Sequence, residues 1–476
     1  MTADKSSLAP VCVRRVCDKV WDVIVVGGGN AAICAAMQAA ESKADVLILE
    51  SAPITMRGGN SRHTRNIRCM HDGENPPLTG QYSEAEFLQD LLQVSDGNTD
   101  RELAVSVIRR SADCLQWMKQ RGVLFQPALS GTLSLQRTNA FFLGGGKALL
   151  NTYFQTANRF GISVLYEAEV CHIRLSDNSF TGVEAMIGGK SVIIKGRSAV
   201  LASGGFQADL DWLEKAWGPP ARNFLVRGTP QNRGKVLRDM MNQGAVTIGD
   251  ASQCHAVAID GRAPKFDGGI VTRIDCIPFS ITVNQYAERF YDEGEDLWPK
   301  RYAIWGRLVA VQPGQQAFAI IDSKSFGLFV PSAFPPIEAD NIQTLAEQIG
   351  LSGEKLTRTV QEFNAACRSG PFDPNALDGL ATVGLGLPKS NWARPINEPP
   401  FRAYMLRPGV TFTYLGLQVD RLARVQGQAG PYENIWAAGE IMAGSVLRQG
   451  YLAGFGMTIG TVFGRIAGEE AARHVL

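Results

Sequence analysis

Short runs of apolar residues near the start of the chain predict a parallel sheet. Val23–Val26 is a β-branched run typical of a strand buried on both faces, and an alanine-rich helix follows it. Ala44–Glu50 predicts a second buried strand, and Ala199–Phe206 predicts a third that runs into glycines. Between them, apolar and polar residues alternate as in antiparallel strands over residues 163–175, 181–187 and 191–194.

Helical periodicity marks residues 84–120, with short polar breaks, and residues 341–367. The last thirty residues predict a helix rich in glycine and alanine. Every fourth residue of this helix is a glycine, so the glycines form one bare stripe: Gly456, Gly460, Gly464 and Gly468. Such a stripe permits close contact with the first strand–helix–strand unit.

The turn between the first strand and its helix has the pattern Gly27-x-Gly29-x-x-Ala32. Gly27 permits a tight turn, Gly29 lets a pyrophosphate approach the backbone, and Ala32 allows close helix packing. The exposed amides at the helix start attract the anion. An ordinary strand-to-helix turn is the alternative explanation, because a glycine triplet alone is a weak signal.

Glu50 favours the dinucleotide interpretation. It ends the second strand, about twenty residues after the glycine turn, where the motif places an acid that accepts hydrogen bonds from ribose hydroxyls. A carboxylate at this position would repel a 2′-phosphate. The sequence therefore predicts FAD or NAD as the ligand, and not NADP.

Arginines, glycines and hydroxyl residues are interleaved in the loop from Arg57 to Cys69, a composition that favours anion binding. Arg62, Arg65 and Arg68 recur every three residues, which would place them on one face if this segment were helical. A solvated basic surface is the alternative interpretation.

Composition narrows the possible functions. The 476 residues carry a formal net charge of +1, so nothing favours nucleic acid or an anionic membrane as a partner. Nine scattered cysteines without a C-x-x-C pair predict a reducing, cytoplasmic location and no metal site in this chain. No apolar run reaches the length of a membrane-spanning helix.

The length of the chain predicts more than one domain. From about residue 256, glycines and prolines punctuate the sequence, and residues 371–400 are rich in both. We expect four segments: a tail over 1–20, the first part of an α/β binding domain over 21–255, a capping domain over 256–405, and the second part of the binding domain over 406–476.

Six motifs resemble, in order, those of the fumarate reductase/succinate dehydrogenase flavoprotein superfamily: the Gly27/Gly29/Glu50 fingerprint, Gly58–Ser61, Leu201–Phe206, Ala287–Phe290, Pro408–Val410 and Ala437–Glu440. Within it, residues 57–71, 407–416 and 450–457 are most similar to the FAD-dependent tricarballylate dehydrogenases, which convert tricarballylate to cis-aconitate. The resemblance implies a split Rossmann-like FAD-binding domain with an inserted α+β capping domain, and an active site where the two meet.

The resemblance also implies which residues bind FAD. Gly27, Gly29 and Glu50 would hold the ADP half, Asn60 and Ser61 the pyrophosphate and the flavin edge, and Val170 the adenine. Glu440 would contact the ribityl chain, and the amides near Gly456 and Met457 the flavin N1/O2 edge. The predicted cofactor site also includes Asn30, Ala31, Ser51, Gly59 and Gly439.

His63 is out of register with the histidine that links FAD covalently in the respiratory enzymes of the superfamily. We therefore expect non-covalent FAD.

Arg289 matches the superfamily's proton-transferring arginine, a role that requires burial beside acids such as Glu293. A plain carboxylate-binding or surface arginine is the alternative. His255 aligns with a histidine that binds a substrate carboxylate. The predicted substrate site also includes Arg273, Arg407, Arg448 and Thr413.

The chain departs from the superfamily at two places. Fumarate reductases carry a histidine in the segment that here reads Thr411–Tyr414, and an arginine where this chain has Tyr451. Both are absent, which disfavours reduction of the fumarate type. Gly450-Tyr-x-x-Gly-x-Gly also resembles the 3-ketosteroid Δ1-dehydrogenases, in which tyrosines transfer protons, so Tyr414 and Tyr451 are candidate catalytic residues.

The resemblance predicts an FAD-dependent oxidoreductase that forms or reduces a C=C bond next to a carboxylate, with tricarballylate as the expected substrate and Arg289 as the proton carrier. It suggests a separate iron–sulfur or haem membrane protein as electron acceptor. Two alternatives stay open: an enone or ketosteroid-type Δ1-dehydrogenase or ene-reductase acting on a less polar substrate, and a flavin-bound regulatory protein without catalysis. The number of cationic groups that face the flavin separates the first alternative from the polycarboxylate enzyme.

Overall fold

The computed structural model describes residues 13–73, 75–127 and 135–476. Its largest sheet has a parallel centre in the order β19-β9-β1-β2-β6. These strands are β1 (Val20–Val26), β2 (Val46–Leu49), β6 (Ser163–Leu165), β9 (Lys190–Leu201) and β19 (Gly430–Ala437). Val23–Val26 is buried between β2 and β9, as the continuous apolar run predicts.

Antiparallel strands extend this sheet on the side of β9 that faces away from β1. β7 (Ala168–Ser176) pairs with β8 (Ser179–Ile187), which pairs with the first half of β9. β18 (Arg424–Gly427) pairs with β19. The alternating stretches predicted from the sequence therefore form the strands expected of them.

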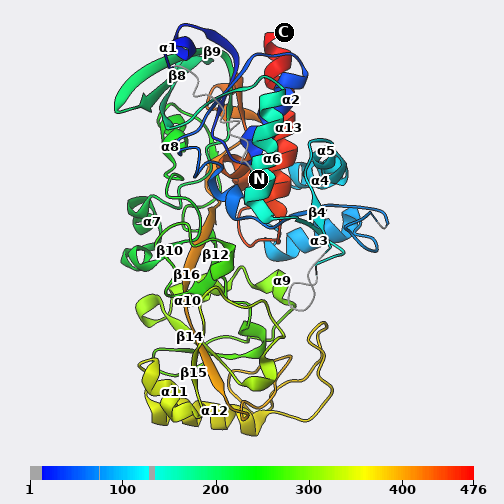
Figure 1. Cartoon of the computed structure of the whole chain (residues 1–476), viewed down its shortest axis with the longest axis vertical. Helices are drawn as coiled ribbons and strands as arrows, with labels where there is room; N and C mark the ends of the chain where they lie inside the picture. The colour runs from blue at the N-terminus through cyan, green and yellow to red at the C-terminus, as the bar shows by residue number, and fades with distance from the viewer. Residues whose placement is uncertain (1–12, 74, 128–134) are drawn as a thin grey trace, which may run out of the picture.

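Two helices pack face to face beside the parallel strands: α2 (Asn30–Glu41) and α13 (Phe455–Val475) (Figure 1). A side chain on Gly464 would overlap the carbonyl of Ala31, and one on Gly468 would overlap the carbonyl of Ala35. The glycine stripe therefore lets the two helix backbones approach each other. Gly456 departs from this pattern, because it faces Tyr451 and Phe412 instead of α2.

The remaining elements of this half surround the sheet. The helices are α1 (Val13–Cys17), α3 (Glu84–Val94), α4 (Arg101–Arg110), α5 (Cys114–Gln120), α6 (Gly145–Arg159), α7 (Leu210–Trp217) and α8 (Lys235–Asn242). Two small sheets contain β3 (Asn66–Arg68), β4 (Phe125–Gln126) and β5 (Asn139–Phe142), and β11 (Thr247–Ile248) with β17 (Gly416–Leu417).

A second sheet is built around the long strand β16 (Phe401–Thr413), which runs from the middle of the molecule into its lower half (Figure 1). Its other strands are β10 (Leu225–Val226), β12 (Cys254–Asp260), β13 (Ile281–Asn284), β14 (Ala317–Ile321) and β15 (Ile337–Ala339). The helices of this half are α9 (Trp298–Arg301), α10 (Trp305–Ala310), α11 (Ile342–Gln348) and α12 (Gly353–Ala366). The fold is thus a split Rossmann-like α/β domain with an inserted α+β cap.

Strands β12 and β16 pass from one hydrophobic core to another. Cys254 and Ala256 pack in the core of the large sheet, whereas Val257 and Ile259 pack in the core of the cap. The expected boundaries, 255/256 and 405/406, fall inside these two strands. Residues 1–12 of the expected tail lie outside the described residues, and α1 packs on the sheet through the buried Val16.

In the parts of the chain that the structure describes, no helix has both the length and the apolar composition needed to cross a bilayer.

The contact between α2 and α13 makes a stability prediction. Gly468→Val should lower the free energy of unfolding by about 1–3 kcal/mol, because the added atoms must displace the α2 backbone. Denaturant unfolding followed by circular dichroism measures this. Glu469→Val is the matched control, since Glu469 is exposed on the same helix. Equal losses in the two variants would show that the contact between Gly468 and α2 does not set the effect.

Candidate active site

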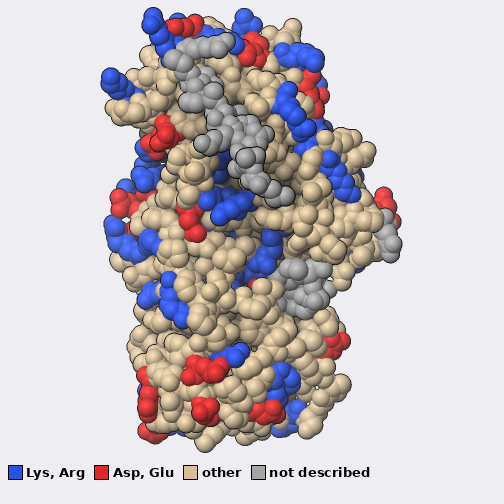
Figure 2. Space-filling view, viewed as in Figure 1, with Lys and Arg blue, Asp and Glu red and all other residues tan. Residues whose placement is uncertain are grey.

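One cavity lies where the large sheet meets the cap. The turn after β1, the end of β2 and the start of α13 line one arm of it, and residues of the cap line the other. Figure 2 shows Lys and Arg side chains at mid-height, between the upper and lower halves of the molecule.

All fourteen residues predicted to bind the cofactor line this cavity: Gly27, Gly29, Asn30, Ala31, Glu50, Ser51, Gly59, Asn60, Ser61, Val170, Gly439, Glu440, Gly456 and Met457. They come from six separate stretches of sequence, which the fold brings together. We call this part of the cavity wall the dinucleotide arm.

The glycine turn leaves the backbone accessible. Gly27 has a φ of 114°, and a side chain there would overlap the carbonyl of Ala202. The turn leads directly into α2, whose first residue, Asn30, donates its backbone N–H to Ser61 Oγ at 3.0 Å. The start of α2 and the glycines therefore fit a pyrophosphate.

Glu50 is 4% exposed and accepts hydrogen bonds from the amides of Ala52 (2.8 Å) and Gly58 (3.4 Å). Burial raises the pKa of this carboxyl above its ordinary value. Its place on the cavity wall fits a carboxylate that accepts ribose hydroxyls.

Glu440 carries a second carboxyl on the same wall, and it is partly buried. It accepts the amide of Thr413 at 2.9 Å, and Gln207 donates to it at 3.4 Å. Burial raises its pKa to about 7, and these hydrogen bonds oppose the rise. The Oε1 of Gln207 is also buried and has no hydrogen-bond partner among the described residues.

The start of α13 differs from the expectation in one respect. Gly456 donates its amide to the hydroxyl of Tyr451 at 3.0 Å, and Met457 donates its amide to the carbonyl of Gly454 at 3.1 Å. In this structure both amides therefore have intramolecular acceptors, although both residues line the cavity.

Three arginines, which we call the guanidinium cluster, line the other arm: Arg65, Arg227 and Arg273. Arg65 precedes β3, Arg227 follows β10, and Arg273 ends a 3₁₀ turn of the cap, Ile270–Thr272. Arg227 is 6% exposed, and so is Arg273.

The guanidinium cluster has few partners. Arg273 donates Nε to Asp275 at 2.6 Å, but its Nη2 is buried without an acceptor among the described residues. The same holds for Nε of Arg65 and for Nε and Nη1 of Arg227. Burial, reinforced by Arg273, lowers the pKa of Arg65 to about 9 and that of Arg227 to about 10. Buried, unpaired cations that face a cavity are suited to an anionic ligand.

Aromatic rings form the wall beside these cations. The ring of His255 stacks on that of Tyr451, with centroids 4.0 Å apart and planes 5° apart. Tyr302 lies edge-on to His255 at 5.6 Å, and Arg273 lies 4.5 Å from the Tyr302 ring. Burial, Arg227 and Arg273 lower the pKa of His255 well below its ordinary value, so its imidazole is neutral.

Arg289 lies in the cap beside Glu293, one of the acids that its expected role requires, and its role in proton transfer stays a prediction. It donates to both carboxylate oxygens of Glu293, at 3.1 and 2.5 Å, and to the carbonyl of Leu387 at 2.9 Å. Glu293, four residues later, holds the guanidinium inside the cap. Arg289 is absent from the cavity wall.

Four other expected site residues also lie off the cavity wall. Tyr414 is buried and donates its hydroxyl to the carbonyl of Gly450, and Thr413 contacts Glu440 from behind. Arg407 donates to the carbonyl of Gly314 at 3.4 Å, and Arg448 donates to Asn98 at 3.2 Å. Of the expected catalytic and substrate residues, His255, Tyr451 and Arg273 line the cavity.

Sequence reasoning missed Arg227 and Tyr302 as site residues. Arg227 follows a two-residue strand, and Tyr302 ends a four-residue helix, so neither belongs to a recognisable motif. The loop over residues 57–69 has an arginine at every third position, and this pattern identified Arg65 as a candidate anion-binding residue. However, residues 59–63 form a 3₁₀ turn and residues 66–68 a strand, so Arg62, Arg65 and Arg68 do not share a helical face.

The model of the family described as FAD binding domain matches residues 22–456. The chain belongs to this family. The family match covers most of the chain, so the protein uses FAD as its cofactor. This agrees with the glycine turn and Glu50 on the cavity wall.

Curated relatives of this FAD binding domain protein include two reductases. The "NADH:fumarate oxidoreductase" of Klebsiella pneumoniae (strain 342) is 25% identical over 469 residues, which cover 96% of this chain and 48% of the relative. The chain thus spans about half the length of that protein. The "Vinyl phenol reductase" of Lactiplantibacillus plantarum is 24% identical, over 95% of this chain and 97% of the relative.

Solved structures show the same fold. The open conformation of a flavocytochrome c3 fumarate reductase has a TM-score of 0.76 at 21% identity, and covers 98% of this chain and 80% of that one. The 3-ketosteroid-delta4-(5alpha)-dehydrogenase from Rhodococcus jostii RHA1 has a TM-score of 0.73 at 23% identity, and covers 97% and 99%.

The unpaired guanidinium of Arg227 makes a prediction for the protein freed of FAD. Arg227→Met should raise the free energy of unfolding by about 1–3 kcal/mol, because a buried cation without a partner is replaced by an apolar chain. Urea unfolding measures this. Arg238→Met is the control, because Arg238 is half-exposed and paired with Asp209, and should change stability by less than about 1 kcal/mol. A destabilised Arg227→Met variant would contradict the assignment.

Glu440 predicts a pH dependence of the same FAD-free protein. The folded protein keeps this proton to about pH 7, whereas the ordinary pKa is 4.5, so the associated stability is present below pH 4.5 and is lost as the pH rises through 7. Glu440→Gln does not titrate. Its free energy of unfolding relative to wild type should therefore rise by about 1–3 kcal/mol between pH 4.5 and 7.5. Parallel pH profiles for the two proteins would contradict this account.

Proposed function

We propose that this enzyme forms or reduces a C=C bond next to a carboxylate, and that its substrate is a polycarboxylate such as tricarballylate, which would be converted to cis-aconitate. The observation that carries the proposal is the guanidinium cluster, Arg65, Arg227 and Arg273, in the same cavity as the FAD arm. Guanidinium groups bind carboxylates in a bidentate manner and so fix their orientation.

Each part of the cavity has a task in this proposal. Glu50 binds the ribose, Asn60 and Ser61 lie along the pyrophosphate and flavin edge, and Glu440 lies beside the ribityl chain. Bound FAD supplies the acceptor or donor of a hydride. The guanidinium cluster holds the carboxylates so that the carbons to be oxidised are fixed, and the low exposure of Arg227 and Arg273 strengthens these charge interactions.

We propose that FAD is bound without a covalent link. The Nε2 of His63 lies 2.7 Å from Asp267 Oδ1, so this ring nitrogen already has a partner in the cap. Electrons would pass to a separate iron–sulfur or haem protein, and the relatives that are named "Fumarate reductase (cytochrome)" support a haem acceptor.

An enone or steroid substrate is the second candidate. The stacked rings of His255 and Tyr451, with Tyr302, give part of the cavity an apolar wall, and the fold resembles a ketosteroid dehydrogenase. The guanidinium cluster disfavours it, since a neutral substrate would leave buried N–H groups of Arg65, Arg227 and Arg273 without acceptors among the described residues.

Anaerobic titration of the FAD-loaded protein with tricarballylate tests the proposal. The oxidised flavin absorbance should bleach, and cis-aconitate should restore it in the reduced protein. Arg227→Met should weaken the apparent affinity about 10- to 100-fold, because it removes one charged hydrogen-bonding partner. A flavin that stays oxidised with tricarballylate, but is reduced by a 3-ketosteroid, would reverse the choice between the two candidates.

A further inference from the structure

Tyr302 occupies an unusual position among the tyrosines near the cavity. It is 5% exposed and lines the cavity, and its hydroxyl makes no hydrogen bond within residues 13–73, 75–127 and 135–476. The hydroxyl of Tyr451, by contrast, accepts the amide of Gly456, and the hydroxyl of Tyr414 donates to Gly450. Tyr302 is thus the tyrosine whose hydroxyl is left for a ligand.

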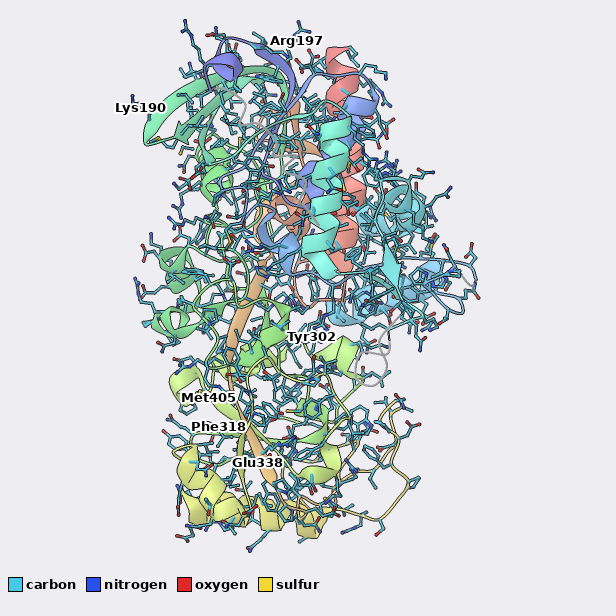
Figure 3. All side chains as sticks on the ribbon, viewed as in Figure 1. Lys190, Arg197, Tyr302, Phe318, Glu338 and Met405 are labelled. Carbon is cyan, nitrogen blue, oxygen red and sulfur yellow. The ribbon has the colours of Figure 1, made fainter. Side chains whose placement is uncertain are left out.

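Hydrogen bonds within the cap place Tyr302 beside the guanidinium cluster. Asp275 Oδ1 accepts from Nε of Arg273 at 2.6 Å and from the indole of Trp298 at 2.7 Å. Trp298 begins α9, and Tyr302 ends it with a backbone hydrogen bond to the carbonyl of Trp298 at 2.8 Å. Figure 3 places Tyr302 at the level where the upper and lower halves of the molecule meet.

The charges around Tyr302 favour one kind of proton transfer. Burial raises the pKa of the Tyr302 phenol, while Arg273, Arg227 and Arg65 lower it. These three cations stabilise a phenolate, which forms when the phenol gives up its proton. A proton on His255 would instead add a positive charge beside Arg227 and Arg273, so the same cations oppose its use as a base.

Building on the proposed function, we propose that Tyr302 is the proton-transferring residue of the reaction, in place of Arg289. In the reducing direction, the Tyr302 O–H bond breaks and its proton is added to one carbon of the C=C bond, while the neighbouring carbon receives a hydride from reduced FAD. In the oxidising direction, the Tyr302 phenolate would take the proton from a carbon beside a carboxylate. The electrons of that C–H bond would form the C=C bond as the neighbouring carbon loses its hydride, for which bound FAD would be the acceptor.

Tyr302→Phe separates proton transfer from binding. We expect the oxidised, FAD-loaded variant to bind cis-aconitate within about 3-fold of wild type in isothermal titration calorimetry. Its flavin reduction by tricarballylate in anaerobic stopped flow should be slower by about 10²- to 10⁴-fold, the usual contribution of a general acid or base. Tyr291→Phe is the matched control, because the Tyr291 hydroxyl bonds only to Glu295 on the exposed side of the cap, and its rate should stay within about 2-fold.

A second variant guards against a loss caused by packing. Site-specific 3-fluorotyrosine at position 302 keeps the ring and lowers the phenol pKa. The pH midpoint of flavin reduction should then shift to lower pH, an effect that a purely structural role would not produce.

The possible outcomes are distinct. Wild type that neither binds cis-aconitate nor is reduced by tricarballylate would refute the proposed substrate. Wild type that reacts, together with a Tyr302→Phe variant of equal rate, would refute the role of Tyr302 alone. Loss of cis-aconitate binding in parallel with the rate would make Tyr302 a binding residue, and would also overturn this inference.

Discussion

The chemistry of this site is set by three guanidinium groups that are largely removed from water and have few counter-ions. Arg65, Arg227 and Arg273 converge on one cavity, and among the described residues only Arg273 has a carboxylate partner, Asp275. Each buried guanidinium loses hydration that no protein group replaces in full, and each repels the others. Such a cluster destabilises the ligand-free protein, and an anionic ligand removes this destabilisation when it binds. The chemistry of the ligand follows from this constraint more directly than from any single motif.

The fold brings these charges together from distant parts of the sequence. Arg65 belongs to the loop that follows the dinucleotide-binding strands, Arg227 follows the short strand β10, and Arg273 comes from the cap. β10 pairs with β16, the strand that passes from one core into the other, so Arg227 sits at the junction. Because the cap supplies Arg273 and Tyr302, a polycarboxylate would be enclosed between the two halves of the molecule.

Much of the dinucleotide arm could be predicted from the sequence because its chemistry is local. A glycine turn between a buried strand and a helix, followed by an acid at the end of the next strand, fixes a phosphate and a ribose within one continuous unit. The glycine stripe of α13 was also readable, since a helix places every fourth residue on nearly the same face. All of these features depend on spacing within a single stretch of chain.

The substrate arm could not be predicted in the same way, because its residues meet only through the tertiary fold. Arg289 matches a motif, yet Glu293, four residues later in a loop, binds its guanidinium. Arg407 lies on β16, as do the cavity residues Thr411 and Phe412, but its side chain reaches Gly314 outside the cavity. Arg227 and Tyr302 carry no sequence signal, since a lone arginine or tyrosine in a short element is ordinary. They are identified as site residues because they are buried on the cavity wall while their side-chain polar atoms lack hydrogen-bond partners among the described residues. Only the three-dimensional structure shows this.

A structure of the FAD-loaded protein with bound cis-aconitate would test the central claim most directly. The account predicts flavin along the arm lined by Gly27, Glu50 and Glu440, and carboxylates within hydrogen-bonding distance of Arg65, Arg227 and Arg273. Phosphates of the cofactor occupying these guanidinium groups, or a polycarboxylate bound elsewhere on the protein, would contradict it.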